Sequence, residues 1–76
     1  MKEPHPNSRF ALCVENKDCE DIERRKIYMV VSDEDAEKDG YFRVVDESGE
    51  DYLYPASYFI LVELPVDAQE AMRAAS

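Results

Sequence analysis

A proline divides the most β-prone part of the chain. In YLYPASYFILVEL, residues 52–64, two apolar runs are separated by Pro55, Ala56 and Ser57. Proline has no backbone N–H and a fixed φ, so Pro55 cannot lie inside the hydrogen-bond ladder of a central strand. Because the apolar pattern resumes at once, we predict a single 3₁₀ turn between two short strands. A corner of this kind suits a small, strongly bent antiparallel sheet.

Alternating apolar residues predict that the rest of the domain is also built from strands. The expected strands cover residues 9–15, 24–32, 41–46, 51–54 and 59–64. A helix competes for residues 19–30, where acids precede bases at helical spacing. The β-favouring run Ile27–Val31 favours a loop followed by a strand instead. The Ser48-Gly49 pair within ESGED predicts a tight hairpin between the third and fourth strands.

The two ends of the chain carry different patterns. Residues 1–8 hold prolines and polar residues and are expected to form a flexible arm. Residues 66–76 predict a short C-terminal helix or tail, with Asp67 as its cap and Glu70 completing a box-like pair. The acidic segment 33–40 is expected to be a plain connection between strands. The sequence leaves open whether the terminal helix packs on its own domain or on a neighbour.

The segment LYPASYF, residues 53–59, resembles the closing signature of Src-homology 3 (SH3) domains. Strand number and loop order over residues 9–65 also resemble that family. The resemblance implies a mainly all-β fold, a small five-stranded antiparallel SH3-like barrel. The chain lacks tryptophan, and its first strand has Phe10-Ala11-Leu12-Cys13 where the family's groove has tyrosines. The resemblance therefore implies the fold rather than binding of proline-rich peptides.

The chain is also similar to short bacterial proteins of unknown function that share the phrase RVVDESGEDYLYP, residues 43–55. This second resemblance implies no particular activity.

Period-two patterns also predict a core. The expected core residues are Leu12, Val14, Ile27, Met29, Val31, Val44, Leu53, Leu61 and Val62, with the register of the second and fifth strands left open. If Leu53 faces this core, Tyr52 and Tyr54 point outward, because neighbouring side chains on a strand alternate. The tyrosines then either cover a small core or form a contact face for a partner.

Charge narrows the classes of partner. Eighteen acidic residues against nine basic ones give a net charge of −9, with Arg24, Arg25 and Lys26 as the one basic cluster. Nucleic-acid affinity depends on cations that neutralise phosphates, so this balance argues against direct nucleic-acid or anionic-membrane binding. No apolar run approaches the ~20 residues of a membrane span. Together with the use of only two cysteines, these patterns predict a cytoplasmic protein.

Residues capable of metal or nucleophilic chemistry are few. Cys13, Cys19 and the lone His5 do not make a zinc set or a catalytic triad, so no catalytic, cofactor or metal site is expected. Residues 35–46, DAEKDGYFRVVD, place acids and a glycine much as a calcium loop does. Strands on both sides, where that motif needs helices, favour an ordinary acidic connection.

These patterns predict a small acidic protein-interaction module with no enzymatic activity. The expected contact surface lies near Tyr54, Pro55 and Tyr58, where the proline-led corner stands beside exposed tyrosines. The expected partner is a protein, and the chain is expected to be a monomer or a weak homodimer. The alternatives are a small nucleic-acid-associated barrel, which the charge disfavours, and a calcium-responsive domain using residues 35–46.

Overall fold

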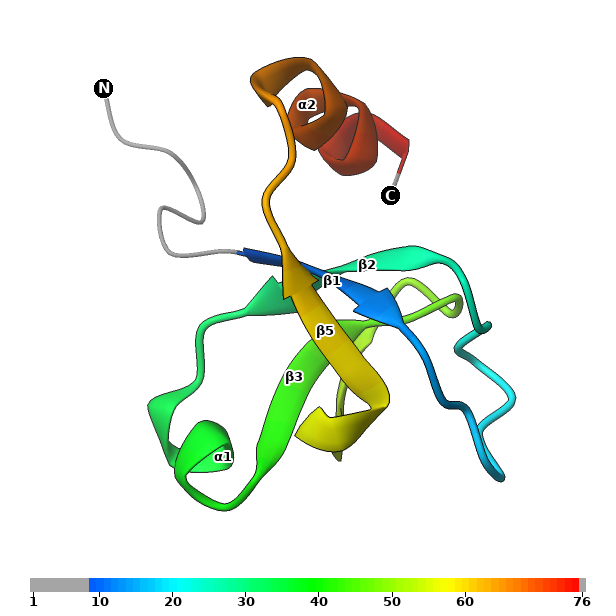
Figure 1. Ribbon diagram of the computed structural model, residues 1–76, viewed down its shortest axis with the longest axis vertical. Helices are drawn as coiled ribbons and strands as arrows, with labels where there is room; N and C mark the ends of the chain where they lie inside the picture. Colours follow the sequence, from blue (N-terminus) through cyan, green and yellow to red (C-terminus); the bar gives the residue numbers. More distant parts are fainter. Residues whose placement is uncertain (1–8, 76) are drawn as a thin grey trace.

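The structure, a computed structural model, describes residues 9–75 (Figure 1). The expected arm, residues 1–8, and Ser76 lie outside the described residues. The elements are β1 (Arg9–Cys13), β2 (Ile27–Val31), α1 (Glu34–Lys38), β3 (Tyr41–Val45), β4 (Asp51–Pro55), the 3₁₀ turn η1 (Ala56–Tyr58), β5 (Phe59–Val62) and α2 (Val66–Ala75).

The strands form a single antiparallel sheet in the order β4-β3-β2-β1-β5. The mainly β class, the five antiparallel strands and the C-terminal helix are therefore confirmed. The ESGED hairpin joins β3 to β4, with Gly49 at φ +87, a left-handed conformation that favours glycine. Strands β4 and β5 are the two edges of the sheet, although they are consecutive in the chain.

The predicted corner at Pro55 is present. Pro55 ends β4 with φ −55 and ψ 131, and the backbone returns to an extended conformation at Phe59. The N–H of Ala56 donates to the carbonyl oxygen of Gly40 at 2.8 Å, which fixes the turn against the chain entering β3. One 3₁₀ turn thus carries the chain from one edge of the sheet to the other.

Phe10, 3% exposed, is buried on one face of the sheet, and the main core cluster lies on the other face. This cluster consists of Ala11, Cys13, Ile22, Tyr28, Val30, Val44 and Phe59, all less than a tenth exposed. Phe59 is its centre, since its ring lies 6.4 Å from that of Tyr28, 6.5 Å from Phe42 and 6.2 Å from Tyr54. Ile22 is buried from a loop, where sequence patterns marked only an isolated apolar residue.

Most of the residues predicted for the core lie on the other face of the sheet. Of its nine members only Val44 is fully buried, whereas Val14, Leu53 and Leu61 are 37%, 47% and 44% exposed. Leu12, Ile27, Met29, Val31 and Val62 are half-buried. Cross-strand pairing places Leu12, Ile27 and Met29 on the face opposite Ala11, Tyr28 and Val30, which we call the outer face. Period-two patterning identified which residues share a face, but both faces are apolar.

The helices also differ from expectation in part. The acidic connection after β2 contains the short helix α1, whose N-cap is Asp33; its carboxylate accepts from the N–H of Ala36 at 3.0 Å. Helix α2 begins at Val66, so Asp67 lies within the first turn rather than capping it. Figure 1 shows α2 beyond the end of β5, on the side of the sheet away from α1. The Arg73 guanidinium stands 5.9 Å from the centre of the Phe10 ring on the outer face.

Candidate functional site

The corner residues predicted as a contact surface meet the long loop between β1 and β2, residues 14–26. The carbonyl oxygen of Tyr58 accepts from the N–H of Val14 at 2.8 Å and from that of Glu15 at 3.3 Å. The acids Glu15, Asp18 and Asp21 of this loop are all exposed. The structure therefore brings Tyr58 and an acidic loop together although more than thirty residues separate them.

Tyr54 has a different environment from the one expected. Its hydroxyl donates to Asp46 at 2.6 Å, and its ring packs edge-on against Phe59. Leu53 is the outward residue instead, so the expectation that Tyr54 points away from the core is wrong. Tyr52 is half exposed as predicted, and its hydroxyl donates to Glu50 at 2.7 Å. Tyr54 thus packs inside the corner, whereas the ring of Tyr52 is accessible to a partner.

We call Tyr54, Pro55 and Tyr58, together with Glu15, Asp18 and Asp21, the aromatic–acidic surface. The pKa of the Tyr58 hydroxyl is raised, first by partial burial and then by the nearby Cys19, Glu15 and Asp18. The pKa of Tyr52 is raised mainly by its hydrogen bond to Glu50, and that of Tyr54 by burial and then by its hydrogen bond to Asp46. The charge of Asp21 adds a smaller increase to both pKa values. Glu15 and Asp18 thus place negative charge near the Tyr58 ring, which suits a cationic contact.

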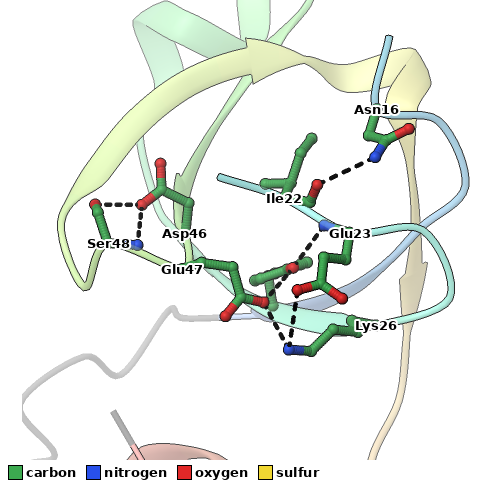
Figure 2. Close-up of polar contacts among 8 residues, drawn as sticks. Asn16, Ile22, Glu23, Lys26, Asp46, Glu47 and Ser48 are labelled. Carbon is green, nitrogen blue, oxygen red and sulfur yellow. Dashed lines mark hydrogen bonds and ion pairs between the residues drawn. The ribbon is translucent and has the colours of Figure 1, made fainter. Parts of the chain in front are cut away.

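A polar network fastens the acidic loop to the β3–β4 hairpin (Figure 2). Glu47 accepts from Lys26 at 2.7 Å and from the Tyr28 hydroxyl at 2.5 Å. The same hydroxyl accepts from the N–H of Glu23 at 2.7 Å. The N–H of Glu47 donates to the carbonyl oxygen of Asp21 at 2.8 Å. The loop is thus held to η1 at its start and to the hairpin at its end.

Asp46 is the buried polar residue of the described chain, 5% exposed. Its carboxylate accepts from the Ser48 hydroxyl at 2.5 Å and the Ser48 N–H at 3.0 Å, as Figure 2 shows, and from the Tyr54 hydroxyl. Burial raises the pKa of Asp46, but the hydrogen bonds from Ser48 and Tyr54 outweigh burial and leave that pKa below its ordinary value. The hydrogen bonds from Lys26 and Tyr28 likewise lower the pKa of Glu47.

Sequence patterns predict only a tight hairpin at ESGED and so miss this network. Glu50 and Asp51 are exposed. Asp46, the residue before ESGED, is hydrogen-bonded to a tyrosine eight positions away, and Glu47 to Lys26 at the end of the β1–β2 loop and to Tyr28 of β2. The Asp-x-Ser spacing of residues 46 and 48 is the one local signal, since aspartate side chains bond the backbone two residues on.

The two buried tyrosine hydroxyls give a prediction for high pH. Burial first, and then the hydrogen bonds to Glu47 and Asp46, raise the pKa values of Tyr28 and Tyr54 above their usual range. A tyrosine whose pKa is higher in the folded than in the unfolded state stabilises the fold fully below the unfolded pKa. This stabilisation is lost progressively as the pH rises towards the folded pKa. We expect the free energy of unfolding to fall as the pH rises beyond about 10, the unperturbed tyrosine value.

Urea titrations between pH 8 and 11 check this expectation. Tyr28→Phe and Tyr54→Phe each remove one ionisable hydroxyl, so each variant should lose part of the alkaline decline. Tyr41→Phe, at an exposed position, should keep the full decline. An identical alkaline slope in all four proteins would contradict the assignment.

The residues of the calcium-like segment are not gathered at one point. Asp35 and Glu37 lie in α1, whereas Asp46 follows the far end of β3 and is committed to Ser48 and Tyr54. Within residues 9–75 no three acidic, histidine or cysteine side chains form a group that could hold a metal ion. Cys13 is buried in β1 and Cys19 half-buried in the loop, both as free thiols. Burial raises the pKa of each thiol.

The chain was compared with protein families, curated proteins and solved structures. No family model, curated protein or solved structure matches the chain. In the described part of the chain, no helix combines the length and apolar character needed to cross a membrane.

Proposed function

We propose that this chain is a non-enzymatic protein-interaction module whose sheet curls into an SH3-like barrel. Two observations support the barrel. The strand order puts β4 and β5 at opposite edges, and one 3₁₀ turn joins them. Phe59 of β5 and Tyr54 of β4 nevertheless have ring centres 6.2 Å apart, so side chains from the two edges meet over the core.

The proposed contact is the aromatic–acidic surface, and the proposed partner is a cytoplasmic protein segment that carries lysine or arginine. One observation supports this most: the double hydrogen bond from Val14 and Glu15 to Tyr58 holds the acidic loop against the corner. Acids beside aromatic rings attract cations through both charge and ring quadrupoles. The same acids repel phosphates, which weighs against a nucleic-acid partner.

Affinity capture with charge variants tests the proposal. Glu15→Lys combined with Asp21→Lys reverses two charges on the surface, and Tyr58→Ala removes its central ring. Both variants should lose the proteins that the unaltered chain captures from its host. Glu34→Lys combined with Asp35→Lys makes the same change of charge in α1 and should keep them. Circular dichroism confirms that each variant is folded.

Two results would reject the surface: equal capture by all variants, or equal loss in the α1 control. Tyr54→Ala is unsuitable as a surface test, because it also breaks the hydrogen bond to Asp46 and the packing on Phe59.

A further inference from the structure

The outer face of the sheet is only partly covered. One row of cross-strand neighbours, Val45, Met29, Phe10 and Val62, runs across β3, β2, β1 and β5. Two residues of helix α2 reach this row: Arg73 stands over Phe10, and Met72 lines an open groove of about 520 Å³ with Met29 and Val45. The next row of the same face, which includes Leu12, is the part of this face left for a partner to contact.

That adjacent row is apolar and open. Leu12 pairs with Ile27 on one side and with Ile60 on the other, and Val14 extends the same face beyond β1. Ile60 is 55% and Val14 37% exposed. Leu12, Cys13 and Val14 line a second hollow, of about 330 Å³, together with Arg24 and Arg25. An apolar hollow beside two guanidinium groups fits an apolar side chain that stands next to a carboxylate.

The two arginines are unusual in this acidic chain. Both are exposed, and neither forms an ion pair with any residue in the range 9–75, whereas Arg9, Lys26 and Arg43 do. Arg25 also has φ +73, and its N–H donates to the carbonyl oxygen of Cys13 at 2.8 Å. A left-handed conformation is strained for any residue with a Cβ, and glycine would relieve the strain. Strain of this kind collects at functional positions.

The chain itself carries a complementary surface. Val66, at the start of α2, is 66% exposed, more than any other large hydrophobic residue described. Asp67 and Glu70 are exposed on the same ten-residue helix. An exposed valine beside two carboxylates matches an apolar hollow beside two arginines.

We propose that two copies of the chain associate through this pair of surfaces. In each of two symmetry-related contacts, Val66 of one copy enters the hollow beside Leu12 and Val14 of the other. Asp67 and Glu70 then face Arg24 and Arg25. A two-fold dimer repeats each contact, so one such pair of surfaces is sufficient for a closed assembly. The contact uses other side chains than the aromatic–acidic surface, so failure of one proposal leaves the other standing.

Sedimentation equilibrium of the full chain over a wide concentration range tests the proposal. The unaltered chain should show a concentration-dependent dimer. Arg25→Glu and Asp67→Arg should each weaken dimerisation at least about tenfold, because each puts like charges opposite one another. The double variant Arg25→Glu/Asp67→Arg should recover most of the lost affinity. Asp35→Arg, in α1, changes the net charge as Asp67→Arg does and should not weaken dimerisation.

Arg25→Gly separates a binding defect from a folding defect. It removes the guanidinium and relieves the backbone, so it should weaken the dimer without lowering the thermal midpoint at a concentration where the chain is monomeric.

Three results would overturn the dimer. They are a monomer at every concentration, a dimer that both charge reversals leave unchanged, and a monomer that binds added hexaglutamate through Arg24 and Arg25. The last would show that the hollow serves a foreign acidic partner.

Discussion

Replacing Phe59 with alanine is expected to lower the free energy of unfolding by about 3–5 kcal/mol. Phe59 is 6% exposed, and its ring contacts Tyr28, Phe42 and Tyr54 from three other strands. Its removal leaves a cavity among these three rings. A domain of this size has a total stability of roughly 5–10 kcal/mol at best, so the variant should be partly unfolded at 37 °C. Urea denaturation followed by circular dichroism measures the loss.

Leu53→Ala is the matched control. The sequence placed Leu53 in the core, where truncation would cost about 2–5 kcal/mol. In the structure Leu53 is 47% exposed on the outer face, so the expected loss is below about 1 kcal/mol. A larger loss at Leu53 than at Phe59 would mean that the core lies on the other face of the sheet.

Local chemistry made the strands and the corner predictable. Pro55 cannot donate to a ladder, and Gly49 accepts a left-handed backbone, so both positions restrict the chain whatever surrounds them. The number of strands and the 3₁₀ turn follow from such residues. Helix α1 was not predicted because five residues are too few to show a helical repeat of apolar residues, although Asp33 is a typical N-cap.

The choice of core face was not predictable from alternation. In β1 the larger residues Phe10 and Leu12 share one face, and the smaller Ala11 and Cys13 share the other. The larger pair looks like the core by hydrophobicity. In the structure, however, the Phe59 ring packs on the face of the smaller residues Ala11 and Cys13. Hydrophobicity alone therefore indicates the wrong face in β1, and only the packing of the whole sheet decides which face carries the main core.

The corner that carries the candidate site was predictable, but the residues packed around it were not. Pro55 and Tyr58 mark the corner from sequence alone. The acids that face it come from the β1–β2 loop, and Glu47 reaches Lys26 and Tyr28 across the sheet. These contacts join residues far apart in sequence, and no local period encodes them. The role of Tyr54 as a support depends in the same way on the burial of Asp46.

The second large effect is expected at Asp46. Asp46→Ala should lower the free energy of unfolding by roughly 2–4 kcal/mol, because the Tyr54 hydroxyl and the Ser48 N–H and hydroxyl lose a buried, charged acceptor. Its pKa is lowered in the folded state, so Asp46 stabilises the fold above its unfolded pKa, and this stabilisation is lost as the pH falls through the lower folded value. Stability measured by urea at pH 7 and at pH 3 should therefore differ less in Asp46→Ala than in the unaltered chain.

Asp51→Ala makes the same change of charge five residues further on. Asp51 is exposed at the start of β4, so its loss should stay within about 0.5 kcal/mol, as for most surface substitutions. The loss of free energy of unfolding in Tyr54→Phe should lie between those of the two variants, because the change removes one donor to Asp46 and leaves Ser48 in place. If Asp46→Ala and Asp51→Ala cost the same, the hydrogen bonds that Ser48 and Tyr54 donate to Asp46 contribute no stability.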